Sequence, residues 1–316
     1  MWLGGHFTNR KVTTRLQLII NIKLPESSNI ESRMHPTPRV LLSIDYEPWF
    51  ALFRWYDKLK DPGQRREIDE GFTLQAIDPI LEQLGDSKAS FYLVGEITGW
   101  YPEVPQRIVS AGHELGLHCH IHRPLENTDE LAQDIRASSL WCRQYGVRGY
   151  RAPMVGISES AYQLLGDSGF SYSSSIYAPT GTLLQKGNVW EIPVSTIRLR
   201  GGNGIIYKAP RDFSFKLLFS GEFPYGSSFS IGLLGKRIFK IIERELKRGV
   251  CPVIILHPYE LVRPFPSSRL TRDLMRNPLF VPFLRDKSAF LAGLLARFPV
   301  SPLGNYLDEA LKTAES

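Results

Sequence analysis

The stretch Gly-His-Glu-Leu-Gly-Leu-His-Cys-His-Ile-His-Arg (residues 112–123) places His118, His120 and His122 at alternate positions directly after a short apolar segment. Neutral imidazole is the commonest metal-binding side chain, and two histidines separated by three residues can reach one ion from a single turn or tight loop. A catalytic zinc usually has three protein ligands and one open position for water. The stretch therefore predicts a metal site whose remaining ligand comes from elsewhere in the chain.

Other segments share one form, an apolar run that ends in polar groups. Residues 41–44 (Leu-Leu-Ser-Ile) read as a buried strand and run directly into Asp45 and Glu47. Late in the chain a second apolar run ends at His257, and Arg151 stands beside a turn. Because α/β barrels keep their chemistry at strand ends, these residues are candidates for one site.

The order of these blocks resembles the polysaccharide deacetylase family, carbohydrate esterase family 4, whose members remove acetyl groups from sugars. The resemblance extends from residue 39 to residue 306. Its blocks are Ser43-Ile44-Asp45-Tyr46-Glu47, the linking run from Lys88 to Gly95, His118 with His122, Arg151-Ala152-Pro153, and Leu256-His257. The resemblance implies an α/β fold, a distorted (β/α) barrel of about seven parallel strands.

The resemblance also implies a role for each block. Glu47, His118 and His122 would hold Zn²⁺ or another divalent cation such as Co²⁺. Bound zinc lowers the pKa of its water to about 7 and polarises a substrate carbonyl. Asp45 would be the general base, and His257 would protonate the departing amine.

Further residues would orient the base or contact the substrate. Arg151 would hold Asp45 ionised by a charge-assisted contact, although a buried arginine paired with Glu191 or Glu260 for structure alone has the same appearance in sequence. Leu256 would line the pocket for the acyl methyl group. The other expected substrate contacts are Tyr150, Pro153, Trp49 and Trp190.

The expected contact at Trp49 belongs to an aromatic cluster. Its other members are Phe50, Phe53, Trp55 and Tyr56. Sugar rings stack their apolar C–H faces on such surfaces, which favours a substrate contact. A partly buried helix beside the barrel mouth would show the same residues.

The chain departs from the family pattern in two places. Many members have adjacent aspartates in the first block, whereas Tyr46 here separates the two carboxylates and the ligand would be a glutamate. The fourth block, in which an aspartate and a tryptophan flank the acid histidine, is represented at best by residues 190–193 (Trp-Glu-Ile-Pro). Glu191 would then support the site without binding the ion. His120 would either do the same or contact the substrate, and His113 would make structural hydrogen bonds.

Composition suits one barrel with extensions. Of the 316 residues, 43% are hydrophobic and 22% charged, and residues 34–316 are expected to form a single domain. Residues 1–33 lack an apolar run suited to a spanning helix or signal peptide, so we expect a disordered leader, or a true start at Met34. Three irregularly spaced cysteines favour a reducing compartment, and hence a cytoplasmic location.

The formal charge of +6 is moderate, and no nucleic-acid partner is expected. The basic residues 236–248 could touch phosphate or a membrane surface, but their apolar members fall at helical spacing, which favours an amphipathic helix packed on the barrel. The expected partner is a glycan or glycolipid substrate, with peripheral membrane contact left open. The sequence gives no indication of oligomeric state.

Hydrophobic spacing predicts alternating strands and helices after residue 39. The expected strands are 40–44, 89–94, 170–172 and the runs that lead to Arg151 and His257. The expected helices are 72–84, 102–111, 129–145, 158–165 and a closing helix at 288–298, with an irregular excursion at 262–282.

Taken together, these features predict a metal-dependent hydrolase that removes an N-acetyl group from a sugar of a surface or lipid-linked glycan. The alternative on the same fold is hydrolysis of another C–N bond, in a formamido sugar or a ring amide. A barrel that only binds glycan is disfavoured, because every position that the chemistry needs carries a competent residue apart from the fourth block.

Overall fold

The computed structural model describes residues 36–53, 58–125, 127–199, 221–263 and 280–315. Residues 1–33, for which the sequence predicts a leader or an incorrect start, lie outside this range, as does most of the expected excursion at 262–282.

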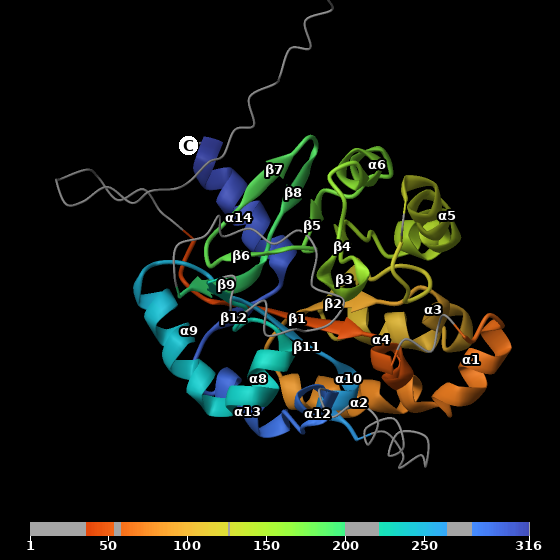
Figure 1. Cartoon of the computed structure of the whole chain (residues 1–316), viewed down its shortest axis with the longest axis horizontal. Coiled ribbons are helices and arrows are strands. Elements are labelled where there is room, and N and C mark those ends of the chain that lie inside the picture. The colour runs from red at the N-terminus through yellow and green to blue at the C-terminus, as the bar shows by residue number, and fades with distance from the viewer. Residues whose placement is uncertain (1–35, 54–57, 126, 200–220, 264–279, 316) are drawn as a thin grey trace, which may run out of the picture.

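The described residues are built around a nine-stranded sheet in which seven consecutive strands, from β11 to β8, run parallel (Figure 1). β7 is antiparallel to β8 at one edge, and β12 is parallel to the start of β1. In spatial order the strands are β11 (Val253–Leu256), β1 (Val40–Tyr46), β2 (Ser90–Leu93), β3 (Glu114–Leu117), β4 (Gly149–Tyr150), β5 (Tyr172–Ser173), β8 (Val189–Glu191) and β7 (Leu184–Lys186), with β12 (Val300–Ser301) beside β1.

A second sheet fills the gap between the two ends of this curled sheet. Its strands are β10 (Glu222–Phe223), β9 (Val194–Arg198) and β6 (Tyr177–Pro179). Gly226 joins this small sheet to β11, because its N–H donates to Ser195 O (3.0 Å) and its carbonyl accepts from Ile255 N–H (2.9 Å). A Cβ atom on Gly226 would lie 2.2 Å from the carbonyl oxygen of Val253, so the close approach requires glycine. The expected distorted barrel is confirmed.

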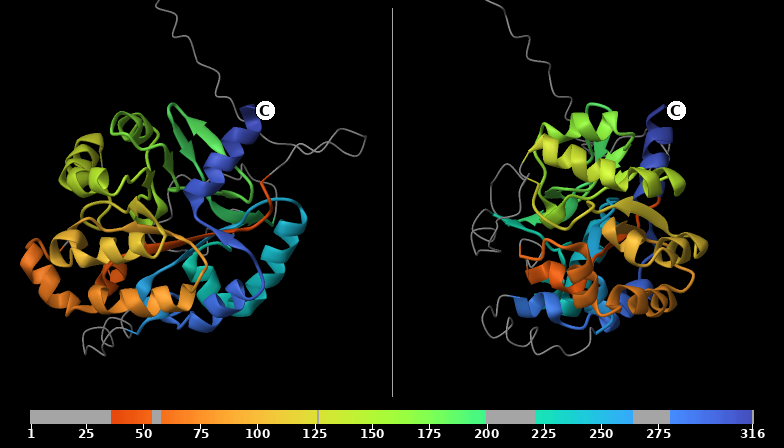
Figure 2. Two further views of the ribbon diagram at one scale, coloured as in Figure 1. Left: turned by 180° about the vertical axis from the view of Figure 1, so that it is seen from behind. Right: turned by 90° about the vertical axis from the view of Figure 1, so that its right-hand side faces the viewer.

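Helices cover the outside of the sheet (Figures 1 and 2). Along the first half of the chain they are α1 (Pro62–Asp69), α2 (Phe72–Leu84), α3 (Glu96–Trp100), α4 (Glu103–Ser110), α5 (Thr128–Gln144) and α6 (Ala161–Asp167). Along the second half they are α8 (Ser228–Leu234), α9 (Ile238–Lys247), α10 (Pro258–Leu261), α12 (Val281–Leu284), α13 (Ser288–Leu295) and α14 (Leu303–Glu315). Short 3₁₀ turns occur at Trp49–Phe53, Pro153–Val155 and Gly235–Arg237.

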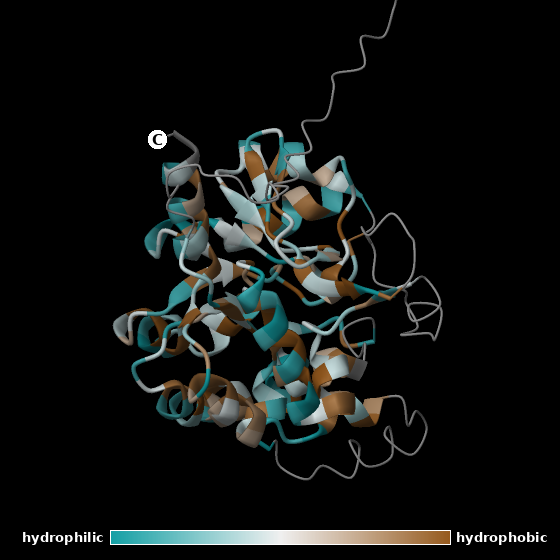
Figure 3. Ribbon diagram, turned by 90° about the vertical axis from the view of Figure 1, so that its left-hand side faces the viewer, coloured by the Kyte–Doolittle hydropathy of each residue, from teal (hydrophilic) through white to brown (hydrophobic). Residues whose placement is uncertain are grey.

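The helix predictions from apolar spacing hold closely. The bounds of α2 are those expected, and each end of α4, α5, α6 and α13 lies within three residues of the expected one. The basic segment forms α9 with Ile238, Phe239 and Ile242 buried, so its interpretation as an amphipathic helix on the barrel is confirmed. Hydrophilic and hydrophobic residues alternate along the helices in Figure 3, as one-sided burial requires. None of the described helices has the length and apolar character to cross a membrane.

Alternation along β1 determines which side chains enter the barrel. Leu42 and Ile44 belong to the large cluster between the sheet and its helices. Leu41 belongs to a second cluster, with Leu303 and Leu307 of α14. Ser43 and Asp45 alternate with the outward-facing residues and are therefore directed to the barrel interior.

Candidate active site

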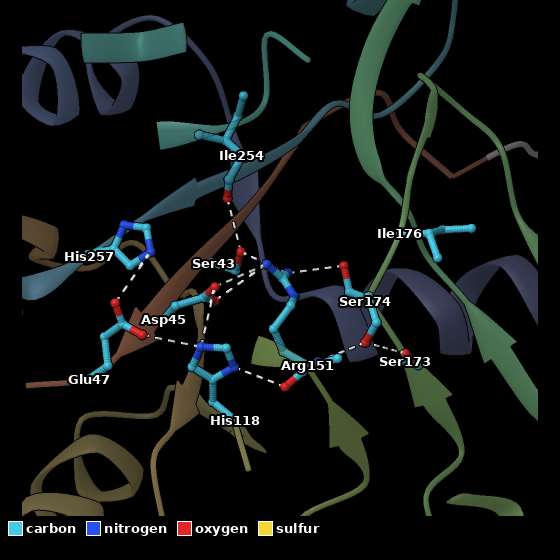
Figure 4. Close-up of polar contacts among 12 residues, drawn as sticks. Ser43, Asp45, Glu47, His118, Arg151, Ser173, Ser174, Ile176, Ile254 and His257 are labelled. Carbon is cyan, nitrogen blue, oxygen red and sulfur yellow. Dashed lines mark hydrogen bonds and ion pairs between the residues drawn. The ribbon is translucent and has the colours of Figure 1, made fainter. Parts of the chain in front are cut away.

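The ends of four parallel strands bring the candidate residues together (Figure 4). Asp45 lies near the end of β1, and Glu47 follows the strand. His118 comes directly after β3, Arg151 after β4 and His257 after β11. Because the strands are parallel and adjacent, side chains up to 212 residues apart in sequence become neighbours. This arrangement agrees with the expectation from sequence that these residues lie in one site.

Glu47, His118 and His122 form a group that could hold a metal ion. Each residue offers one ligand atom, and these atoms all lie within 4.8 Å of one another. Nε2 of His122 lies 2.8 Å from Glu47 Oε2, and Nε2 of His118 lies 3.4 Å from the same oxygen. Glu47 Oε2 is buried and accepts no hydrogen bond of good geometry. A cation would satisfy this oxygen.

The tautomer of His118 also fits a cation. Its Nδ1 lies 2.9 Å from the main-chain carbonyl oxygen of Arg151, which can only accept a hydrogen bond. Nδ1 therefore carries the proton, and in the neutral ring Nε2 bears a lone pair directed at the Glu47 carboxylate. Two electron-rich atoms that face each other in a buried site repel unless a positive charge lies between them. Metal-binding histidines commonly donate their second N–H to a carbonyl in this way.

Glu47 is held by a residue that sequence reasoning missed. The Tyr259 hydroxyl donates a hydrogen bond to Glu47 Oε1 at 2.8 Å. The other carboxylate oxygen, Oε2, therefore remains available to bind a metal ion. Burial raises the pKa of Glu47, but the nearby His122 and His118 outweigh burial and hold it well below the usual range. The only sequence signal for this contact was the position of Tyr259 two residues after the candidate acid.

Arg151 pairs with Asp45 in the barrel interior. Its Nη1 lies 3.4 Å from each carboxylate oxygen of Asp45, and its Nη2 donates to Ser43 Oγ (3.2 Å) and Ser174 Oγ (3.0 Å). The guanidinium also lies 4.6 Å from the centre of the Tyr92 ring. Arg151 is fully buried and forms its ion pair with Asp45, whereas the sequence had also left Glu191 and Glu260 open as partners.

His120 contacts α5, and it does not belong to the candidate ligand group of Glu47, His118 and His122. Its Nδ1 lies 3.1 Å from Ser138 Oγ of α5, and its main-chain N–H donates to Asp134 at 2.6 Å. Cys119 has a left-handed backbone (φ 60°), which rotates the chain between the two candidate ligands His118 and His122. The Cys119 thiol is buried, and burial raises its pKa well above the ordinary value, which disfavours the thiolate that metals bind.

His257 lies between two carboxylates. Its Nδ1 lies 3.1 Å from Glu260 Oε1, and its Nε2 lies 3.9 Å from Glu47 Oε1. The ring stacks on Tyr259 with centroids 5.2 Å apart and planes 13° from parallel. Burial lowers the pKa of His257, but Glu260 outweighs it and the pKa rises to about 9. Glu260 was considered from sequence only as a partner for arginine.

Glu191 does not contact His257, the position at which the family's fourth block would support the acid. Its carboxylate accepts from the main-chain N–H groups of Ser175 (2.6 Å) and Ile176 (3.2 Å) and from the hydroxyl of Tyr162 (3.0 Å). Burial raises its pKa, although these donors oppose the rise. Glu191 therefore braces the loop after β5, next to Ser174, which holds Arg151.

Burial separates the expected substrate contacts. Leu256 and Tyr150 do not match the expectation, because both are buried in the cluster between the sheet and its helices, where Tyr150 packs edge-on against Phe170. Pro153 is buried in the 3₁₀ turn after β4. Trp49 is 4% exposed in the core, so its ring offers no open face for a sugar. An aromatic run in sequence does not reveal which members are buried. The expected contact at Trp190 instead packs against the cluster of Tyr172, Leu41 and Leu307, whereas the site lies at the other end of β1. Trp55 and Tyr56 lie outside the described residues.

Comparison with known proteins relates part of the chain to one family. The family model for polysaccharide deacetylases matches residues 67–173. Over these residues the chain is similar to that family. A peptidoglycan-N-acetylglucosamine deacetylase of Bacillus cereus is 29% identical over 101 residues, and the match covers 29% of this chain and 37% of that deacetylase. The chain thus spans little more than a third of this curated relative.

A solved structure has the same fold as this chain. PuuE allantoinase superposes with a TM-score of 0.55 at 14% identity, over 93% of this chain and 100% of that one. A putative polysaccharide deacetylase from Mycobacterium smegmatis gives a TM-score of 0.49 at 17% identity, over 89% and 97% of the two chains. At these identities the likeness concerns the fold alone.

Proposed function

We propose that this polysaccharide deacetylase relative is a metal-dependent hydrolase that removes an N-acetyl group from an amino sugar of a surface or lipid-linked glycan. The observation that carries the proposal is the division of labour between two carboxylates. Glu47 belongs to the three-residue ligand group, whereas Asp45 lies outside it and pairs with the buried Arg151. The same strand end thus provides a ligand and a separate base.

A bound divalent cation would supply a nucleophilic water near neutral pH and polarise the acetyl carbonyl. The ligand set of two histidines and one glutamate is typical of catalytic zinc, and Co²⁺ is a usual substitute. Asp45 would accept the proton of the attacking water, and Arg151 would keep its carboxylate oriented. Ser43 and Ser174 fix the guanidinium from the other side.

His257 would protonate the leaving amine. Its Nε2 side faces Glu47, so the ring borders the ligand group, and its Nδ1 side is occupied by Glu260. The candidate base and the candidate acid therefore both border the ligand group, with Asp45 3.9 Å from Nε2 of His118 and His257 3.9 Å from Glu47. Leu256, expected from sequence to line the acyl pocket, packs instead in the cluster between the sheet and its helices, so it is not assigned this role.

The amino-sugar substrate is supported by the Bacillus cereus relative, a deacetylase of peptidoglycan N-acetylglucosamine. Other C–N bonds need the same base and acid. A formamido sugar or a ring amide is therefore the alternative, and PuuE allantoinase shares this fold.

The test is to incubate the zinc-loaded chain with N-acetylated and N-formylated oligosaccharides, lipid-linked sugars and cyclic amides, and to identify products by mass spectrometry. Release of acetate from an amino sugar is expected, and a His118→Ala/His122→Ala variant should release none. Release of formate or ring opening alone would favour the alternative. Glycan binding by the zinc-loaded chain without release of any product would contradict the proposal.

A further inference from the structure

One buried carboxylate holds His257 at two points. Glu260 Oε1 lies 3.1 Å from the ring Nδ1, and Glu260 Oε2 accepts the main-chain N–H of His257 at 3.0 Å. The two contacts fix both the backbone and the plane of the ring. Nε2, the other ring nitrogen, is thereby directed to the side of Glu47.

Glu260 is itself held rigidly. It is 1% exposed, its Oε1 lies 3.0 Å from Nζ of Lys287, and it accepts a hydrogen bond from the hydroxyl of Ser228. Lys287 is 2% exposed and lies within hydrogen-bond distance of the carbonyl oxygens of Pro282 and Phe283, so α13 and α12 anchor the ion pair. Two charged groups are thus kept out of water beside the ring, an arrangement that is costly unless every charge is paired.

The other carboxylates near the strand ends are occupied elsewhere. Glu191 bonds to the loop after β5, Asp45 pairs with Arg151, and Glu47 belongs to the ligand group. Glu260 is the carboxylate that lies within hydrogen-bond distance of His257 Nδ1.

We propose that Glu260, with Lys287 as its fixed counter-charge, is the positioning residue for His257 as the leaving-group acid. The inference deepens the proposed function and rests on it. When the C–N bond breaks, the proton on Nε2 passes to the amine nitrogen, and the neutral ring keeps its Nδ1 proton in the hydrogen bond to Glu260. The carboxylate thus sets which nitrogen gives up its proton.

A purely structural role would have a different signature. Glu260 is also the third residue of α10, where an acidic side chain can cap a helix, and its ion pair joins α10 to α13. Loss of such a cap would weaken the fold and affect every substrate alike. Loss of a positioning residue should affect only reactions that need the acid.

The decisive variant is Glu260→Gln, measured in the zinc-loaded full chain. On an N-acetylated sugar, kcat/KM should fall about 10–100-fold, a typical loss for a group that orients a functional histidine. On 4-nitrophenyl acetate, whose leaving group departs without a proton, the loss should be several-fold smaller. Zinc content should equal that of the wild type. Glu222→Gln removes a buried, hydrogen-bonded carboxylate of the small sheet and serves as the matched control.

A double variant and a spectroscopic measurement complete the test. Glu260→Gln should add no further loss on the amide once His257→Ala is present. In ¹⁵N-histidine spectra of the zinc-loaded protein, Glu260→Gln should shift the Nδ1 signal of His257, assigned by its absence in His257→Gln, while the signals of His113 stay in place. Equal losses on amide and ester, additive losses in the double variant, or an unchanged His257 signal would each overturn the proposal.

The spectrum also separates this proposal from the proposed function. A wild-type chain that cleaves no amide, but whose His257 signal depends on Glu260, would refute the deacetylase assignment and leave the positioning contact established. If Glu260→Gln does not fold, Glu260→Asp keeps the charge beside Lys287 and shortens the reach to Nδ1, and it should give the same selective loss and the same signal shift.

Discussion

Nδ1 of His118 lies 2.9 Å from the carbonyl oxygen of Arg151, so the candidate metal ligand after β3 is oriented by the backbone of the arginine after β4. The same arginine pairs through its side chain with Asp45. One residue therefore connects the ligand group with the candidate base. This connection explains why neighbouring strand ends, rather than one local motif, define the site.

The first prediction concerns the ligands. His118→Ala and His122→Ala should each lose bound zinc, because each removes one of three protein ligands. Chelation should abolish turnover, and Zn²⁺ or Co²⁺ should restore it. Metal content by mass spectrometry is the measurement. His120→Ala should retain the ion, since its ring contacts Ser138 instead. Stoichiometric zinc in the His118→Ala/His122→Ala variant would place the site elsewhere.

Asp45→Asn should separate the base from the ligands. The variant should keep zinc, because Glu47 is the carboxylate of the ligand group. Its kcat/KM should fall about 10²–10⁴-fold, the usual range for a general acid or base. The loss should be as large on an activated ester as on an amide, since water must be deprotonated in both reactions. Loss of zinc from this variant would mean that Asp45 and Glu47 have exchanged roles.

Tyr259→Phe should weaken metal binding without unfolding the protein. The substitution keeps the ring stacked on His257 and removes only the hydroxyl that donates to Glu47. Zinc affinity, measured by competition with a chelator, should fall about 10–100-fold. Tyr225→Phe is the matched control, because it removes a buried hydroxyl bonded to Thr180 in another part of the fold. Equal affinity in wild type and Tyr259→Phe would show that the contact does not orient the ligand.

His113 should make stability depend on pH. Burial lowers its pKa to about 4, and its Nδ1 accepts the main-chain N–H of Ala89, so the folded state holds the neutral ring. Between pH 6.5 and pH 4 the unfolded chain binds the proton more readily, so the stabilising contribution of His113 is complete above pH 6.5 and is lost as the pH falls. The effect is up to about 3 kcal/mol.

The measurement is the difference in urea stability between wild type and His113→Asn at several pH values. Asparagine can accept the same hydrogen bond but does not titrate. The wild type should gain stability relative to the variant as the pH rises from 4 to 6.5. Taking this difference cancels the opposite contribution of Asp69, whose pKa burial raises to about 6. A constant difference across this range would contradict the prediction.

The sequence allowed prediction of the site residues that follow long apolar runs. Strands such as β1 and β11 are read from composition, and parallel order then brings their ends together, which is why Glu47 and His257 could be placed in one site. The strand expected at 170–172 is β5, which lies at Tyr172–Ser173. β10 and β12 have two residues each, too few for a pattern, and the small sheet and α14 were missed. The contacts of Tyr259 and Glu260 depend on how α10 turns back over the site, which no local pattern encodes.

The left-handed backbone at Cys119 has a further consequence. Its carbonyl accepts the N–H of Gly95, and Asp134 of α5 accepts the next two main-chain N–H groups, so distant segments impose the bend between the candidate ligands His118 and His122. A non-glycine residue held in this region costs about 1–3 kcal/mol, which an isolated peptide would not sustain. The spacing of His118 and His122 is therefore not sufficient to bind a metal ion outside this fold. A synthetic fragment of residues 112–123 would carry the histidines but not the geometry that makes them a site.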